Sequence, residues 1–161
     1  MSGESGTASI TPVGEIMSEQ LETINFSNTA QESAIKMSDR NVSSLVVLDD
    51  NGKAIGIITE RDLVRRVCTR DVPSNSVNVE NVISSPVKNV SPETSVDEVA
   101  DVMVSNKVRH VVIVDRNQKP VGIISATDIV AYVRENSQNV AKISSDVIDA
   151  LEREGRHTGE G

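Results

Sequence analysis

Aromatic residues are almost missing from this chain of 161 residues, which contains one Phe, one Tyr and no Trp. Basic residues are also outnumbered: 16 Lys and Arg stand against 24 Asp and Glu, which leaves a formal net charge of −8. Nucleic-acid binding depends on a basic surface and on aromatic rings that stack on bases. We therefore expect no nucleic-acid partner, and the same charge disfavours binding to anionic membranes.

Cysteines and long apolar runs are scarce as well. Cys68 is the only cysteine, which excludes an intramolecular disulfide and is typical of a reducing compartment. No apolar run approaches the roughly 18 residues of a membrane-spanning helix. Residues 1–9 lack the basic and apolar parts of a signal peptide. The sequence thus predicts a cytoplasmic protein without a membrane segment.

Sets of residues that would carry catalysis or bind a metal are also missing. The two histidines, His110 and His157, are far apart, and no His/Cys/Asp cluster has the spacing of metal ligands. The sequence suggests no Ser-His-Asp or Cys-His set and contains no phosphate-binding glycine loop. We expect no metal site, no required cofactor and no enzymatic activity.

What the chain does contain is an internal repeat. A shift of 66 residues places residues 13–67 over residues 79–133 without a gap. A match of this length indicates a duplicated folding unit. The identical pairs include Ser18/Ser84, Glu32/Glu98, Met37/Met103, Asp49/Asp115, Gly56/Gly122 and Asp62/Asp128.

Each copy is predicted to be a β-α-β-β-α unit. In the first copy the strands cover residues 21–25, 45–48 and 54–59. The first helix begins at Thr29, and the second helix runs from about residue 60 to residue 69. The patterns Thr29-x-x-Glu32 and Ser95-x-x-Glu98 match capping boxes. Apolar runs predict sheets that are covered by helices. A three-stranded sheet alone is marginal, so the fold class is α/β (α+β), with the two repeats packed in pseudo-two-fold symmetry.

The remaining segments flank the repeats. We expect a disordered N-terminus at 1–9, the first repeat at 10–70, a linker at 71–78 and the second repeat at 79–136. An amphipathic C-terminal helix is expected at 137–153, followed by a disordered tail at 154–161. This helix either folds back on its own subunit, which is the simpler interpretation, or forms a dimer contact. Its apolar stripe consists of Val140, Ile143, Val147, Ile148 and Leu151.

A Gly-Ile-Ile-[Thr/Ser]-x-x-Asp motif closes the last strand of each copy, at residues 56–62 and 122–128. Glycine lets another group approach the backbone closely. The Thr or Ser begins a helix whose free N–H groups attract anions. The Asp carboxylate can accept the hydroxyl groups of a ribose. The alternative interpretation is an ordinary helix cap, in which Thr59 and Asp62 only stabilise the start of the helix.

The repeated unit resembles the cystathionine β-synthase (CBS) domain, and two such units in tandem resemble a Bateman module. The resemblance rests on the Val-Val-[Leu/Val]-Asp run and the motif that follows it, and it covers about residues 13–133. It leaves no segment large enough for a catalytic domain. It implies two clefts between the paired repeats, each able to hold AMP, ADP, ATP or an adenosine-containing relative such as S-adenosylmethionine.

The resemblance also implies roles for individual residues. The two motif aspartates would bind ribose hydroxyls, the motif Thr and Ser would meet phosphate, and the first strand of each copy would line the adenine. The full set of ligand-binding residues that we expect is Thr23, Ile24, Asn25, Gly56, Ile58, Thr59, Arg61, Asp62, Asn89, Val90, Ser91, Lys107, Arg109, His110, Gly122, Ile124, Ser125, Thr127 and Asp128.

The two copies differ in charge just before their middle strand. Lys107, Arg109 and His110 in the second copy stand where residues 41–44 of the first copy carry no charge. The family places Arg109 and His110 at phosphate-contacting positions, and arginine can bind phosphate in a bidentate manner. We expect two unequal clefts: one binds more tightly, or Arg109 and His110 serve both phosphates near the pseudo-two-fold axis.

The second helix of the first copy carries a basic stripe, Arg61, Arg65 and Arg66. It is either a solvated helix face, a supply of positive charge for phosphate, or part of a dimer interface. A homodimer is expected from the family. Apolar residues of the second helices would suit such an interface or, alternatively, the core of each repeat: Leu63, Val64, Val67, Ile129, Val130 and Val133.

The function expected is a regulatory module that binds adenine nucleotides between its repeats and transmits the change to an effector protein that the sequence does not identify. The alternative is a protein-interaction or dimerisation module whose clefts are vestigial. The response of the melting temperature to adenosine compounds separates the two, because a bound ligand stabilises the folded state.

Overall fold

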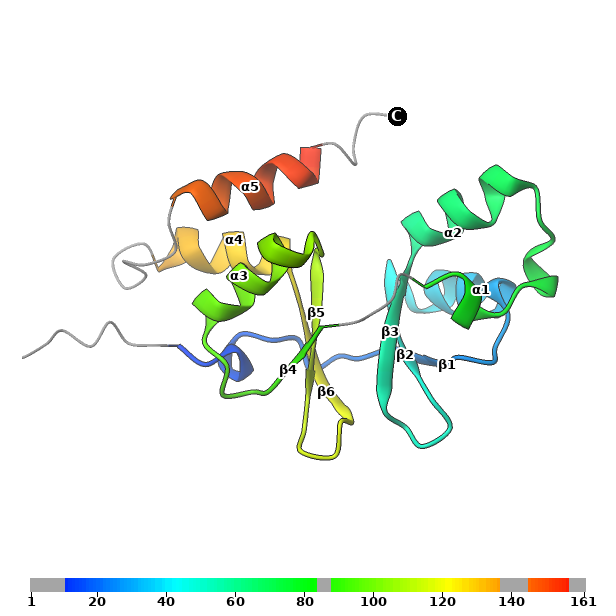
Figure 1. The fold of residues 1–161 in the computed structure, drawn as a ribbon, viewed down its shortest axis with the longest axis horizontal. Helices are drawn as coiled ribbons and strands as arrows, with labels where there is room; N and C mark the ends of the chain where they lie inside the picture. The colour runs from blue at the N-terminus through cyan, green and yellow to red at the C-terminus, as the bar shows by residue number, and fades with distance from the viewer. Residues whose placement is uncertain (1–10, 84–87, 137–144, 157–161) are drawn as a thin grey trace, which may run out of the picture.

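The computed structural model describes residues 11–83, 88–136 and 145–156. Two three-stranded sheets face each other at the centre of the molecule, and helices cover their outer sides (Figure 1). The first sheet has the order β1 (Thr23–Asn25), β2 (Ser44–Leu48) and β3 (Ala54–Thr59). The second has the order β4 (Asn89–Val90), β5 (His110–Val114) and β6 (Pro120–Ser125). In each sheet the first two strands are parallel and the last two are antiparallel.

Four helices complete the two units, α1 (Ala30–Arg40) and α2 (Glu60–Arg66) in the first and α3 (Val96–Asn106) and α4 (Ala126–Glu135) in the second. The predicted β-α-β-β-α order is therefore confirmed in both copies. Helix α2 is shorter than expected, because a separate 3-10 turn at Cys68–Arg70 follows Arg66. Cys68 in that turn is exposed and does not pack in the core.

Strand alternation explains how each sheet is buried on both faces. In β2, Leu45 and Val47 pack under the helices of their own repeat, and Val46 between them points the other way, toward the second sheet. Burying an aliphatic side chain of this size stabilises the fold by roughly 1.5–3 kcal/mol. The inter-sheet core that joins the repeats is formed by Val46, Ala54, Ile57, Val112 and Val114.

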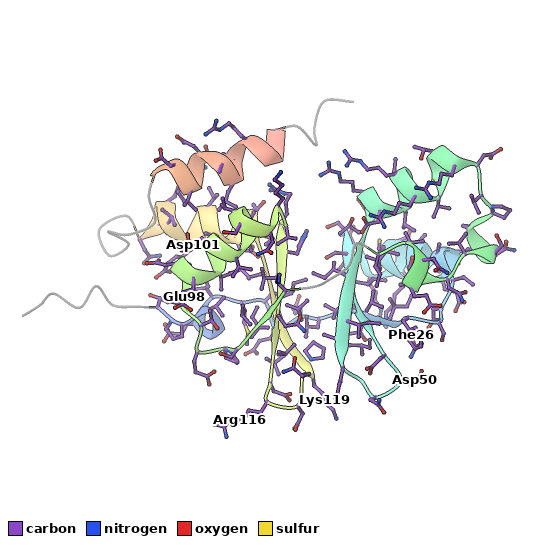
Figure 2. The ribbon with its side chains drawn as sticks, viewed as in Figure 1. Phe26, Asp50, Glu98, Asp101, Arg116 and Lys119 are labelled. Atoms are coloured by element: carbon purple, nitrogen blue, oxygen red, sulfur yellow. The ribbon has the colours of Figure 1, made fainter. Side chains whose placement is uncertain are left out.

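The two hairpins also meet at one end of the molecule. The backbone N–H of Ala54 donates to the carbonyl of Gln118 at 3.1 Å. Figure 2 shows Asp50 at the β2–β3 turn and Lys119 at the β5–β6 turn on the same side of the molecule. The pseudo-two-fold axis thus passes between two sheets that share a core and a hydrogen bond.

Each repeat is preceded by a short segment, around Val13 in the first and around Val79 in the second, which we call its lead-in. The two lead-ins are exchanged, so that each packs on the opposite repeat. The N–H of Val13 donates to the carbonyl of Thr94 in the second repeat at 2.7 Å, and Val13 is buried in that repeat's core. The N–H of Val79 donates to the carbonyl of Asn28 in the first repeat at 2.8 Å, and Val79 is buried in the core of the first repeat. Each packed unit therefore contains the lead-in of the other sequence repeat.

The motif glycines make room for these exchanged segments. A Cβ on Gly122 would lie 2.2 Å from Met17 Sδ, and a Cβ on Gly56 would lie 2.6 Å from Ile83 Cδ1. Met17 and Ile83 are themselves equivalent under the 66-residue shift. The close approach that we expected for a ligand is thus made by a side chain of the opposite lead-in.

The C-terminal helix α5 (Ser145–Arg156) folds back onto the second repeat and packs against α3 and α4 (Figure 1). Leu151 is buried in the core of that repeat, and Val147 is partly buried against it. The helix continues three residues beyond the expected end at Arg153, so the prediction of a tail from 154 was wrong for 154–156. Residues 137–144, with Val140 and Ile143, lie outside the described part of the chain, as do 1–10 and 157–161.

Candidate ligand site at the facing ends of the sheets

Each motif lies where the last strand of a sheet passes into a helix. Thr59 pairs with Ser44 in the first sheet, and Ser125 pairs with His110 in the second. The first amide of each helix is already satisfied, because Glu60 N–H donates to the carbonyl of Ser43 and its counterpart in α4 does the same with residue 109. Residues 43–44 and 109–110 therefore lie directly beside the two motifs.

The Thr/Ser and Asp of each motif form complete capping boxes. In the first copy, Asp62 N–H donates to Thr59 Oγ1 at 3.2 Å, and the Thr59 N–H and hydroxyl each donate to Asp62 Oδ2 at 3.0 Å. In the second copy, the N–H of Ser125 donates to Asp128 Oδ2 at 2.9 Å. The capping interpretation is thus confirmed. It does not exclude a ligand, because Asp128 is exposed and its Oδ1 has no hydrogen-bond partner among the described residues.

His110 connects the two motifs electrostatically. Alternation along β5 places it on the same face as Val112 and Val114, which pack between the sheets. Burial and the neighbouring Arg109 charge lower the pKa of His110, whereas the carboxylates of Asp128 and Asp62 raise it. The imidazole is therefore within electrostatic range of both motif aspartates, one from each repeat.

Arg109 points to the opposite face of its strand and is engaged by α5. Its Nη1 donates to the backbone carbonyl of Leu151 at 3.1 Å. A cavity of about 280 Å³ adjoins this contact, between Arg109, α4 and α5. Arg109 and His110, which the sequence places together, thus serve two different faces of the sheet. The cavity is lined by Arg109, Ala126, Thr127, Val130, Arg134, Leu151 and Glu152.

A second cavity, also of about 280 Å³, lies between the repeats. Its walls are the lead-in residues Gln20–Glu22, the polar residues Ser43 and Ser44 beside the first motif, and Ile123 of the opposite sheet. The sequence prediction did not include residues 20–22. An internal repeat gives no signal for them, because it does not show which residues of one copy face the other copy.

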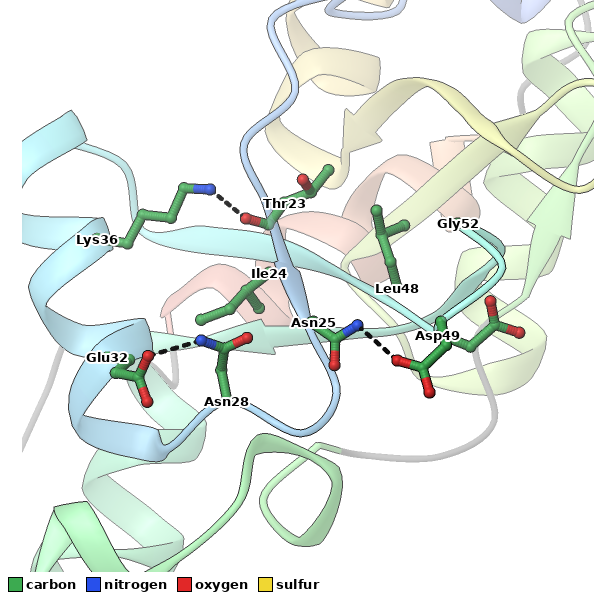
Figure 3. A pocket seen from close by; sticks show the side chains of 10 residues that line it. Thr23, Ile24, Asn25, Asn28, Glu32, Lys36, Leu48, Asp49 and Gly52 are labelled. Carbon is green, nitrogen blue, oxygen red and sulfur yellow. Dashed lines mark hydrogen bonds between the residues drawn. The ribbon is translucent and has the colours of Figure 1, made fainter.

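Thr23, Ile24 and Asn25, expected to line the adenine, do not border this inter-repeat cavity. They line a larger depression of about 530 Å³ at the outer edge of the first sheet, with α1 and the β2–β3 turn (Figure 3). Asn25 pairs with Leu48, at the end of the sheet away from Thr59. In this depression Asn25 Nδ2 donates to Asp50 Oδ1 at 3.2 Å, and the Lys36 ammonium donates to the carbonyl of Thr23.

The corresponding residues of the second repeat are placed in the same way. Asn89, Val90 and Ser91 line a depression of about 460 Å³ at the outer edge of that sheet. Asn89 also reaches the first repeat, since its Nδ2 lies 3.4 Å from the carbonyl oxygen of Ala54. Its buried Oδ1 has no described hydrogen-bond partner. The first strands therefore do not meet the motifs at one site.

Strand alternation also separates the motif isoleucines. Ile58 and Ile124 are fully buried in the cores beneath the helices, so their side chains do not face the space between the sheets. Ile57 and Ile123 occupy that face instead. This result follows from the alternation of side chains along a strand, because residues 57 and 59 share one face and residue 58 points to the other.

The remaining predicted residues lie at the surface, and Thr127 among them also lines the cavity beside Arg109. Arg61, Lys107 and Thr127 are exposed, and Lys107 is the left-handed residue that ends α3. Within the described ranges no group of three or more His, Cys, Asp or Glu side chains is arranged for a metal ion. None of the described helices is long and apolar enough to cross a bilayer.

Comparisons with known proteins agree with this architecture. The chain is 36% identical over 119 residues to an uncharacterized 17.7 kDa protein of Acidianus ambivalens, covering 74% of this chain and 71% of that protein. It is 30% identical to the uncharacterized protein YlbB of Bacillus subtilis, covering 90% and 97%. It is also 28% identical to an inosine-5′-monophosphate dehydrogenase of Nitrosopumilus maritimus, of which it spans 23%.

Solved structures show the same fold. A conserved CBS domain protein of unknown function from Thermoplasma acidophilum superposes with a TM-score of 0.74 at 26% identity, covering 90% of this chain and 76% of that one. A hexameric CBS-CP12 protein from cyanobacteria has a TM-score of 0.68 at 22% identity, covering 94% and 96%. The CBS domain model matches residues 13–69 and 79–135. Tandem CBS domains generally act as regulatory, ligand-binding modules, and this chain belongs to the CBS domain family.

Proposed function

We propose that this CBS pair binds an adenine nucleotide between its repeats and passes the change to a partner protein. The observation that carries the proposal is the position of His110, which lies within electrostatic range of both Asp62 and Asp128. A phosphorylated ligand bound beside His110 would interact with charges of both repeats. Its binding would therefore favour one arrangement of the two sheets over another, which is the requirement for a ligand-driven switch.

Each group has a role that suits a nucleotide. The free Oδ1 of Asp128 would accept a ribose hydroxyl while Oδ2 stays in the helix cap. The N–H of Thr127 has no acceptor among the described residues, and with the N-terminal end of α4 it would face phosphate. Arg109, which lines the cavity beside Thr127, would supply positive charge. The same adenosine chemistry fits AMP, ADP, ATP and S-adenosylmethionine.

The two halves of the site would bind unequally. Ser43 and Ser44 stand in the first repeat where Arg109 and His110 stand in the second. Moreover, α2 has 7 residues and α4 has 10, so the first repeat presents a shorter helix to an anion. We therefore expect the higher affinity on the Asp128 side, where Arg109 adds positive charge that the first repeat lacks.

Calorimetry and thermal shift with AMP, ADP, ATP and S-adenosylmethionine test the proposal. A ligand at 100 times its dissociation constant stabilises the fold by about 2.7 kcal/mol, which raises the melting temperature of a chain of this size by roughly 5–11 °C. Asp128→Asn should weaken binding more than Asp62→Asn. The matched control Asp101→Asn changes an exposed carboxylate on α3 and should leave binding unchanged.

Two results would contradict the proposal. If no adenosine compound shifts the melting temperature, the chain acts as an interaction module without a nucleotide site. If nucleotide binds but Asp128→Asn and Asp62→Asn both bind as tightly as the unchanged chain, the ligand lies elsewhere, for example in the depression beside Asn25.

A further inference from the structure

The outer face of α2 is exposed along its whole length. Arg61, Val64, Arg65 and Cys68 follow one another at helical spacing, and all four are exposed. Val64 is 55% exposed, one of two large apolar side chains in the described residues with such exposure. The other apolar residues expected at a dimer interface are at least partly covered: Leu63, Val67, Ile129, Val130 and Val133 pack in or against the cores of their repeats. We call the four exposed residues the α2 stripe.

The α2 stripe is also unpaired and basic. No acidic side chain of the described residues forms a salt bridge with Arg61 or Arg65, and Arg70 beyond the stripe is likewise exposed and without such a partner. This positive surface belongs to a chain with a net charge of −8. Positive charges around an exposed valine favour a partner that carries acidic groups around an apolar side chain.

The second repeat shows what covers the equivalent surface. Under the 66-residue shift the α2 stripe corresponds to Thr127, Val130, Ala131 and Arg134 on α4. Helix α5 lies beside part of that surface: Leu151 and Val130 line the same cavity, whereas Thr127, Ala131 and Arg134 stay exposed. Glu152 of α5 accepts a hydrogen bond from Arg134 at 2.5 Å. An amphipathic helix with acidic residues thus adjoins in one repeat the face that has no such neighbour in the other (Figures 1 and 2).

We propose that the α2 stripe binds an acidic amphipathic helix of a partner protein, in the manner in which α4 holds α5. Val64 would take the apolar side of the helix, and Arg61 and Arg65 would pair with its carboxylates. A second copy of this chain is a poorer occupant in a two-fold arrangement, because it would bring the same arginines of both copies together. On the α4 face of that copy, Arg134 is already paired with Glu152 of its own α5.

A stapled helical peptide with the sequence of residues 145–156, labelled with a fluorophore, is a suitable probe, because it contains Leu151 among acidic residues. Stapling is needed because a helix of this length is marginal in water. We expect the full chain to bind it with micromolar affinity that weakens as salt is added. Val64→Glu and the double change Arg61→Glu/Arg65→Glu should each weaken binding at least about tenfold.

Matched controls make the result specific. Ile35→Glu changes the other exposed apolar residue, which is 51% exposed on α1, and should leave binding unchanged. A peptide whose acidic residues are replaced by their amides should bind poorly. Circular dichroism melting should show that Val64→Glu remains folded, since its side chain lies at the surface.

Three outcomes would overturn the proposal. The unchanged chain fails to bind the peptide. Val64→Glu binds it as tightly as the unchanged chain, which means that the peptide exchanges with α5 on α4. Sedimentation shows that the chain alone forms dimers that Val64→Glu dissociates, which means that a second copy occupies the α2 stripe.

Discussion

Arg109 donates a hydrogen bond from Nη1 to the carbonyl oxygen of Leu151 at 3.1 Å, and so ties the middle strand of the second repeat to the C-terminal helix. Hydrogen bonds that involve a charged group contribute about 1.5–3 kcal/mol, and this one is only partly buried. Arg109→Ala should therefore increase hydrogen exchange in α5. Arg134→Ala, which removes an exposed salt bridge with Glu152, should have a smaller effect.

The same contact predicts a coupling between ligand and helix. A phosphate that recruits Arg109 competes with the carbonyl of Leu151, so a saturating nucleotide should increase hydrogen exchange at the end of α5. The exchange should not change with nucleotide in Arg109→Ala. Equal protection of α5 with and without bound nucleotide would show that phosphate does not use this arginine.

Gly122→Ala should destabilise the chain more than Gly56→Ala. The new Cβ of Gly122→Ala would meet Met17 at both Sδ (2.2 Å) and Cγ (2.7 Å), close to the backbone of Met17. At Gly56 the contact under 3.0 Å is with the mobile end of Ile83. Overpacking of this kind costs about 1–3 kcal/mol.

Chemical denaturation measures the difference, and Met17→Ala supplies the control. Truncation of Met17 leaves its Cβ at 3.2 Å from the position that an added methyl group would take at Gly122. Most of the cost of Gly122→Ala should therefore disappear in the Met17→Ala background, as a double-mutant cycle would show. Additive costs would mean that Met17 is not the obstructing group.

The stability of the chain should fall as the pH drops below the usual pKa of histidine. The folded state lowers the pKa of His110 from its ordinary value of 6.5, chiefly through burial. Near and below pH 6.5 the unfolded chain therefore binds more protons than the folded chain. The contribution of His110 to the free energy of unfolding is complete above about pH 7 and is lost as the solution becomes more acidic. His110→Gln should flatten the decrease between about pH 5 and 7.

The other histidine provides the control for this measurement. His157→Gln should keep the decrease of the unchanged chain, because His110 is still present. Denaturation midpoints at several pH values compare the three proteins. A decrease that is the same in the unchanged chain and in His110→Gln would assign the effect to another group.

Helices α1 and α3, the first helix of each repeat, should differ in how much stability they draw from their N-cap residue. Thr29 accepts from Glu32 N–H at 3.1 Å, and Glu32 accepts in return from Thr29 N–H at 3.2 Å. At Ser95 only the first of these bonds is present, from the N–H of Glu98 at 3.2 Å. We expect Thr29→Ala to cost about 1–2 kcal/mol and Ser95→Ala about 0.5–1 kcal/mol in urea denaturation. Equal costs would show that the reciprocal bond adds nothing.

Local patterns predicted much of this chain correctly. Strand alternation, cap residues and the repeat gave the β-α-β-β-α order, because these features depend on neighbours in the chain. The cap interpretation of the motif was confirmed at Thr59 and Ser125. The separation of Arg109 from His110 also follows from a period of two, although the sequence prediction assigned both residues to phosphate contacts.

The candidate site was less predictable than the fold. Gly56 and Gly122 were expected to face a ligand, and they face Ile83 and Met17 instead. Thr23–Asn25 were expected at the adenine, and they line an outer depression, whereas Gln20–Glu22 border the inter-repeat cavity. The contacts of the two glycines follow from the exchange of the lead-in segments, whereas Glu22 and Thr23–Asn25 pack along β2 of their own repeat.

The sequence by itself determined the duplicated unit, its helices and strands and the capped motif at the end of each sheet, since all of these are set by short-range periodicity. Only the tertiary structure decided which copy each lead-in packs against, because two copies with the same apolar pattern offer nearly equivalent cores. It also decided that α5 packs against α4 and not against α2. That choice depends on the packing of Leu151 in the second repeat and on the bond from Arg109, which has no counterpart at Ser43.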